Sequence, residues 1–466
     1  MFALFFFFFW FFIKKGSNNI RWLFFVGASF FFYGWWDWRF LLLIVGSGLI
    51  DFFAGLGIYR FPNHKKLLLF VSLLGNLGSL MIFKYSRFFA DNVEWLFGLF
   101  GQNIDLVARI PDFILILPVG ISFYTFQSMS YTIDVYRNQL TPTKNIFHFF
   151  AYLSMFPQLV AGPIVRAKDF LPQLRRVRSV SEVERWHGMK LIVVGFFKKV
   201  VLADNIAPMV NAAFLDSELT HSTIYWWGIM VAFAFQIYFD FSGYSDIARG
   251  LAKWMGFHFR INFNHPYIST SVRDFWTRWH ISLSTWFRDY VYIPLGGSKK
   301  GKFRWYLNMW ITMLVSGFWH GAAHNFIVWG ALHAFYLSVE RIFKLPRRLK
   351  KIFLGKYLAW VLVMVQVLIA WVFFRASSFE QAWQITVNML SFNFSDDFSG
   401  LFTHANAAIF LTLAVVIESF FLFNIQPKKW FSEKNYFYVE ILYLAVLIAA
   451  CVFLRGEGQQ FIYFQF

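Results

Sequence analysis

The sequence predicts an all-helical protein that is embedded in a membrane and crosses it many times. Hydrophobic residues make up 58% of the 466 residues and charged residues only 15%, whereas soluble globular proteins carry roughly 25% charged residues. The mean hydropathy of +0.51 points the same way. This composition excludes a disordered, collagen-like or disulfide-stapled protein and leaves little room for a soluble enzyme. The single cysteine, Cys451, excludes intrachain disulfides and cysteine-based metal sites.

Apolar stretches follow one another along the chain. Residues 2–13 lack the basic region and cleavage site of a signal peptide, so we expect a retained membrane segment there. Residues 22–33 and 40–59 predict a hairpin. Several later stretches are shorter than the ~20 residues of a full span, which predicts tilted or re-entrant pieces among about 10–12 spanning helices. The later stretches are 67–83, 88–101, 113–133, 146–165, 190–204, 224–248, 305–320, 324–341, 352–375, 406–425 and 437–454.

The charge is unevenly distributed. Lys and Arg number 43 against 25 Asp and Glu, a net charge of +18 that would suggest nucleic-acid binding in a soluble protein. Here the basic residues lie between apolar stretches, where the positive-inside rule places them, so we expect a topology signal and contact with anionic lipid. Loop 376–404 is acidic, which puts it and the C-terminus opposite the cytoplasmic basic loops. Those basic loops are 166–190, 296–304, 343–351 and 426–434.

Two polar clusters interrupt the apolar pattern. The first, Leu117–Arg137, is dense in hydroxyl groups and ends in Asp134 and Arg137. The second, Gln236–Arg249, places Asp246 and Arg249 at i, i+3, where they can pair, and leaves Asp240 without an obvious local partner. Charged groups in membrane spans are costly and are functional candidates by default. Polar contacts that hold a helix bundle together explain these clusters equally well.

A third cluster, Arg273–Gly297, is too polar for a span that faces lipid. Its aromatic side chains alternate with charged ones, which favours an amphipathic or partly buried segment that lines an aqueous cavity on the cytoplasmic side. A simple interfacial anchor would explain the Trp and Arg residues but not His280 between them. The members are Phe275, Trp276, Trp279, Trp286 and Phe287 with Arg273, Asp274, Arg278, His280, Arg288 and Asp289.

His320 is the sharpest candidate for a chemical role. It lies sixteen positions beyond Arg304, and a helix would carry it some 24 Å from the basic loop at ~1.5 Å per residue. Gly317 and Gly321 permit a break in the helix there. We expect His324 and His333 simply to bond to a neighbouring helix.

The sequence contains no Walker, HExxH, GxSxG or CxxC motif. A deep histidine reached by water suits abstraction of a hydroxyl proton, because its pKa is near neutrality, and a second polar group can stabilise an oxyanion. Acyl transfer to a hydroxyl fits this pair. Proton-coupled transport fits the same residues, so both stay open at this point.

The motifs together resemble the membrane-bound O-acyltransferase family. They are FPQLVAGPIVR, YFDFSGYSDIARGLAKWMGF, NHPY, FWTRWHISLSTWFRDYVYIPLGG, GFWHGA and FIYFQF. The likeness extends from about residue 117 to Phe466 and is greatest to the bacterial branch that acetylates alginate, peptidoglycan or cellulose. It implies one membrane domain, with N-terminal helices at 1–110, a catalytic core at 111–345 and C-terminal helices at 346–466, arranged as a ring of tilted helices around a tunnel.

The resemblance also implies roles for individual residues. His320 would be the catalytic histidine and general base, and His280, forty positions earlier, would orient or polarise the thioester carbonyl. A covalent acetyl-histidine relay is a variant of this scheme. We expect the substrate to contact Trp276, Arg278, Trp279, Ser282, Trp319, Asp240 and Asp246.

The same resemblance implies the partners. Acetyl-CoA would be the cytoplasmic donor, with no bound cofactor, metal or nucleic acid. The acceptor would be an extracytoplasmic polysaccharide, reached directly or through the serine of a partner acetyltransferase, across a bacterial inner membrane. Transfer of D-alanine to teichoic acid, and a polysaccharide or lipid translocator without enzymatic activity, are the competing hypotheses.

Overall fold

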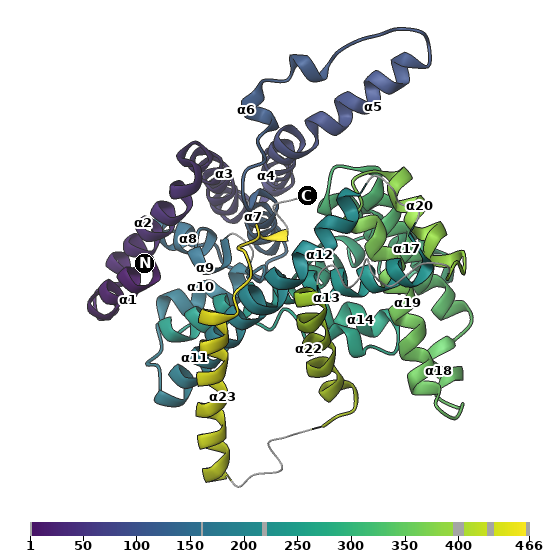
Figure 1. Ribbon diagram of the computed structural model, residues 1–466. Coiled ribbons are helices and arrows are strands. Elements are labelled where there is room, and N and C mark those ends of the chain that lie inside the picture. The colour runs from purple at the N-terminus through teal and green to yellow at the C-terminus, as the bar shows by residue number, and fades with distance from the viewer. Residues whose placement is uncertain (1, 160–161, 217–220, 395–404, 426–432, 463–466) are drawn as a thin grey trace. The chain divides into compact units, whose positions relative to one another are not determined.

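The structure is a computed structural model that describes residues 2–159, 162–216, 221–394, 405–425 and 433–462. Within these ranges all regular structure is helical, which confirms the predicted fold class (Figure 1). The chain forms two compact units. Unit 1 comprises Met1–Gly188 and Ala248–Arg260, and unit 2 comprises Met189–Ile247 and Ile261–Phe466.

Unit 1 is built around helix α3, which packs beside α4 and α7. Gly55 on α3 permits this approach, because a Cβ there would lie 2.7 Å from the ring of Tyr131. The predicted stretch 113–133 is two helices, since Gly120 adopts a φ of 72° and starts a new one. The helices of unit 1 are α1 (Phe2–Ile13), α2 (Asn18–Asp37), α3 (Leu41–Arg60), α4 (Lys65–Leu80), α5 (Ser86–Gly98), α6 (Asp112–Leu115), α7 (Ile121–Tyr136), α8 (Ile146–Leu153), α9 (Phe156–Leu159) and α10 (Ala167–Arg175).

The first polar cluster holds helices of unit 1 together. The buried carboxylate of Asp51 accepts hydrogen bonds from Asn76 at 2.7 Å, from Thr132 at 2.8 Å, and from the hydroxyl groups of Ser72 and Ser128. These donors come from α4 and α7, so one carboxylate ties three helices to each other. This arrangement favours the structural interpretation of Leu117–Arg137.

Unit 2 contains a tight hairpin of α16 and α17, and α19 packs against α17. A side chain on Gly317 or Gly330 would collide with a backbone carbonyl of the other helix. Two helices, α11 (Glu182–Phe196) and α13 (Thr223–Met255), belong partly to each unit. The remaining helices are α12 (Asp204–Leu215), α14 (Val272–Arg278), α15 (Ile281–Phe287), α16 (Lys302–His320), α17 (His324–Ile342), α18 (Leu345–Leu349), α19 (Gly355–Arg375), α20 (Phe379–Leu390), α22 (Ala405–Leu422) and α23 (Glu433–Phe453).

Six helical segments of the described chain are long and apolar enough to cross a membrane, fewer than the spans expected from the sequence. Protein covers 72% of the most apolar part of α13 but only 11% of that of α23, whose apolar side chains are therefore available to lipid. The six segments are Asn18–Arg60, Pro62–Gly98, Thr223–Met255, Gly355–Arg375, Ala405–Leu422 and Asn435–Phe453. The predicted tunnel stays a prediction. Residues Asp396 and Asp397 of the acidic loop and most of loop 426–434 lie outside the described residues.

Candidate active site

His320 is the last residue of α16, and α17 begins four residues later at His324. The predicted break in the helix is therefore present. Only 4% of His320 is exposed. Gly321 is required beside it, because a Cβ there would run into the ring of Phe326, which covers the break.

Aromatic rings from three helices surround the imidazole of His320. The ring centroids of Trp319, Trp329 and Phe374 lie 5.0, 4.9 and 5.2 Å from that of His320, all in edge-to-face geometry. Because these bulky rings pack closely, they fix the orientation of the imidazole and limit the access of water to it. Such an environment suits a base that must receive its proton from a bound hydroxyl group.

His280 lies between the short helices α14 and α15. It is fully buried and adopts a φ of 41°, which is rare for a residue with a side chain and must be held in place by the surrounding structure. Burial lowers the pKa of His280 to about 3, so the imidazole is neutral at pH 7. A neutral imidazole has one N–H that can donate to a carbonyl oxygen.

Asn262 organises the loop around His280 and was not among the residues predicted from the sequence. Its Oδ1 lies 3.3 Å from His280 Nδ1 and accepts from the backbone N–H of Ser282 at 3.1 Å and from the hydroxyl of Ser282 at 2.9 Å. Its Nδ2 donates to Ser245 Oγ on α13 at 3.2 Å. Ser282, predicted to bind substrate, thus contacts Asn262. In the sequence, the only indication of this role is that Asn262 lies two residues before the NHPY motif.

One chain of buried rings joins the two histidines. Neighbouring ring centroids along it are between 4.9 and 6.1 Å apart, so each ring is in contact with the next. In order, the rings belong to His280, Phe263, Trp279, Trp371, Trp329 and His320. The structure therefore places both predicted catalytic residues in one aromatic cluster, together with the predicted Trp279 and Trp319.

His333 differs from its expected role. It is fully buried, yet neither of its ring nitrogens has a hydrogen-bond partner among the described residues, so the expected bond to a neighbouring helix is wrong. Its ring lies 4.8 Å from Trp329 and 5.0 Å from Trp276, and in the described part of the chain the indole N–H groups of both also lack partners. Unpaired buried polar groups cost about 1–3 kcal/mol each, a cost that a bound ligand or water would remove. The i, i+4 spacing of Trp329 and His333 on one helix was the sequence signal that could have indicated the contact between their rings.

Three other predicted residues are engaged in ion pairs. Arg278 binds Asp274 at 3.0 Å. Asp246 binds Lys198 of another helix at 2.7 Å, and its expected pairing with Arg249 stays a prediction. Asp240 does have a partner, since Lys199 lies 2.8 Å away and also binds Asp204. These contacts account for the charges of the second cluster without a catalytic role. No group of three His, Cys, Asp or Glu side chains suited to a metal ion occurs among the described residues.

The fold and site define a helical, multi-pass membrane protein with a buried histidine centre. Residues 139–383 match the membrane-bound O-acyltransferase family, and the chain belongs to that family. It is 41% identical to the probable alginate O-acetylase AlgI of Pseudomonas aeruginosa, over 77% of this chain and 67% of that protein. It is 37% identical to a peptidoglycan O-acetyltransferase of Helicobacter pylori, over 77% and 71% of the two chains. A teichoic acid D-alanyltransferase of Streptococcus thermophilus is 32% identical over 48% of this chain and 56% of its own.

Proposed function

We propose that this protein transfers an acetyl group from cytoplasmic acetyl-CoA to a hydroxyl group of an extracytoplasmic polysaccharide, directly or through a partner acetyltransferase. The observation that carries the proposal is the position of His320, at the break between helices α16 and α17 and enclosed by Trp319, Trp329 and Phe374. The names of the relatives that acetylate alginate and peptidoglycan support the acetyl group and the polymer acceptor. A bacterial inner membrane is the compartment where both substrates meet.

In the proposed reaction His320 acts as the general base. It accepts the proton of the acceptor hydroxyl as that oxygen attacks the thioester carbonyl, and a C–O bond forms. His280, which is joined to His320 through four aromatic rings, is assigned the role of orienting or polarising the thioester carbonyl as negative charge develops on its oxygen. The C–S bond then breaks, and the proton held by His320 passes to the departing thiolate. Atoms and charges balance without a metal or a bound cofactor.

The ester content of the exported polymer tests this proposal in cells. We expect a His320→Ala strain to lose nearly all acetyl ester while the protein stays at normal abundance in the membrane. The matched control is His324→Ala, which removes an exposed histidine four residues away on the same hairpin. Wild-type ester content in the His320→Ala strain would overturn the proposal.

D-alanyl transfer is a second candidate, because the match to a D-alanyltransferase includes part of the same core. Membranes that contain the protein distinguish the two donors. We expect label to pass from acetyl-CoA and not from a D-alanyl carrier protein. If label passes only from the D-alanyl carrier protein, the transferred group is D-alanine and not acetyl, and the proposed role of His320 is unchanged.

A further inference from the structure

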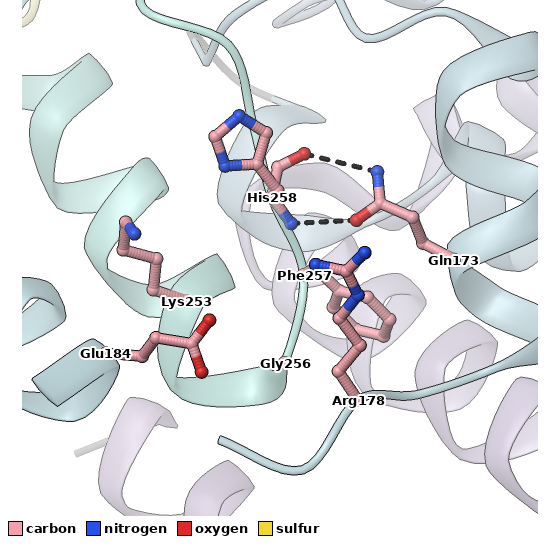
Figure 2. Close-up of a pocket in the computed structure, with 7 residues that line it drawn as sticks. All are labelled: Gln173, Arg178, Glu184, Lys253, Gly256, Phe257 and His258. Carbon is pink, nitrogen blue, oxygen red and sulfur yellow. Dashed lines mark hydrogen bonds between the residues drawn. The ribbon is translucent and has the colours of Figure 1, made fainter. Parts of the chain in front are cut away.

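A hollow of about 300 Å³ lies in unit 1, whereas His280 and His320 belong to unit 2. Its wall is formed by the end of α10, the loop that follows, the start of α11 and the end of α13 (Figure 2). Because α13 is one of the helices able to cross the membrane, the hollow lies where a span meets the basic loop 166–190. The lining residues are Gln173, Arg178, Glu184, Lys253, Gly256, Phe257 and His258.

Two of the seven residues that line the hollow are cations, and one is an anion. Arg178 and Lys253 border it, and within the described residues neither side chain has a hydrogen bond or ion pair with a protein group. Burial lowers the pKa of His258, and the positive charges of Lys253, Arg249, Arg178 and Arg260 lower it further. Two unpaired cations beside a concave surface are expected where an anion binds.

The only carboxylate in the lining, Glu184, is already engaged. It forms a reciprocal pair with Ser181, in which the backbone N–H of Ser181 donates to Glu184 Oε2 at 3.0 Å and that of Glu184 donates to Ser181 Oγ at 3.2 Å. This is the capping box of helix α11. The hydrogen bond from Ser181 and the charges of Lys253 and Arg178 hold the pKa of Glu184 below its usual range.

The backbone that carries the cations is fixed by two contacts. The side-chain amide of Gln173 accepts from the N–H of His258 at 2.8 Å and donates to its carbonyl at 3.3 Å (Figure 2). Gly256 adopts a φ of 91°, and a Cβ there would lie 2.7 Å from the carbonyl oxygen of Arg178. The glycine thus lets the end of α13 and the loop of Arg178 approach each other closely. The site is organised before any ligand arrives.

We propose that this hollow is a binding site for a phosphate ester. The planar guanidinium of Arg178 can bind two phosphate oxygens at once, and the ammonium of Lys253 adds a compact charge beside it. The volume is at the lower end of the range typical of small-molecule sites. Phosphate esters reach the junction of membrane and water from two sources, soluble nucleotides and the headgroups of anionic lipids. The inference does not depend on the proposed acetyl transfer, since binding is measured without turnover.

The test compares the full-length protein with two double variants in nanodiscs. The first, Arg178→Ala with Lys253→Ala, removes both unpaired cations. The control, Arg176→Ala with Arg185→Ala, removes the same charge from exposed residues outside the lining. Adenosine 3′,5′-bisphosphate binding to discs of phosphatidylcholine measures the soluble source. Retention of phosphatidylglycerol, followed by native mass spectrometry, measures the lipid source.

We expect the first double variant, but not the control, to bind one of the two probes at least about tenfold more weakly, because charge-assisted hydrogen bonds are lost. The arm that responds identifies the source of the phosphate. Equal binding of both probes by the two variants would overturn the proposal.

Glu184→Gln gives a test with the opposite sign. Glutamine can also close a capping box, so helix α11 is retained while a negative charge is removed from the wall. We expect the responding probe to bind several-fold more tightly, by about threefold or more. A general destabilisation of the protein cannot produce tighter binding, so unchanged or weaker binding would contradict the electrostatic basis of the site.

Discussion

The imidazole of His320 lies edge-on to the indole of Trp329, with ring centroids 4.9 Å apart and an interplanar angle of 80°. Trp329 is fully buried and also contacts His333 and Trp371. One indole therefore connects the proposed base with the rest of the aromatic cluster.

Replacement of Trp329 by Phe tests whether the indole orients His320. The smaller ring keeps an apolar core but leaves space in which the imidazole can turn, and a small misplacement can cost about a hundredfold in rate. We expect kcat of acetyl transfer to fall by at least about tenfold, with little change in protein abundance. Trp383→Phe, at an exposed position on α20, is the matched control. Equal loss in both variants would show that the effect is not specific to His320.

Asn262→Ala tests the loop of His280. The change removes an acceptor shared by His280 and Ser282, so the imidazole loses its orientation although it is retained. We expect kcat to fall by about tenfold or more, since a hydrogen-bonded group that fixes a catalytic geometry is lost. The control is Asn264→Ala, an exposed asparagine two residues along the chain. Normal kcat in the Asn262 variant would exclude this positioning role.

His333→Phe separates a ligand role from a packing role. Phenylalanine has a similar shape and no unpaired nitrogen, so a purely structural histidine should be replaced with unchanged or higher thermal stability. If the nitrogens of His333 bind substrate or an ordered water, activity should fall by about tenfold while stability is kept. Activity and melting temperature measured on the same sample decide the matter. Full activity with raised stability would leave His333 a residue of the core.

The pH dependence follows from the neutral state of His280. Its pKa is lowered from 6.5 to about 3 by burial, so the folded protein does not bind this proton at moderately acidic pH, whereas the unfolded chain does. The free energy of unfolding is therefore unaffected by this group above about pH 6.5. As the pH falls from there toward 3, the unfolded chain gains a proton that the folded protein does not, and the free energy of unfolding decreases by up to about 1.4 kcal/mol per pH unit. Unfolding of the detergent-solubilised protein between pH 4 and 7 measures this slope. His280→Asn should reduce it, and an identical slope would contradict the assignment.

The helix break at His320 was predicted correctly from the sequence, because Gly317 and Gly321 flank it, whereas the surroundings of His320 were not predicted. The depth of His320 in the membrane stays a prediction. Asp240 forms its ion pair with Lys199, His280 is hydrogen-bonded to Asn262, and the ring of His333 contacts that of Trp276. In each pair the two residues are far apart in the sequence. Only the packing of the folded chain brings these residues together.

The polar clusters illustrate the same limit. Hydroxyl groups in Leu117–Arg137 could equally serve catalysis or helix packing as long as their partner was unknown. The partner is Asp51, a buried carboxylate on a helix more than sixty residues earlier in the chain, bound by Ser128 and Thr132. No local pattern distinguishes these uses, because both require hydroxyl groups on a buried helix face.

The most direct test of the account is acetyl transfer by the purified protein. Full-length wild type, His320→Ala and His324→Ala would be reconstituted in lipid with labelled acetyl-CoA and polysaccharide, together with the partner acetyltransferase where transfer requires one. The account predicts that wild type and His324→Ala form labelled ester at similar rates and that His320→Ala is slower by about a thousandfold or more, as expected for loss of a general base together with its positioning. Ester formation by His320→Ala at the wild-type rate would contradict the central claim.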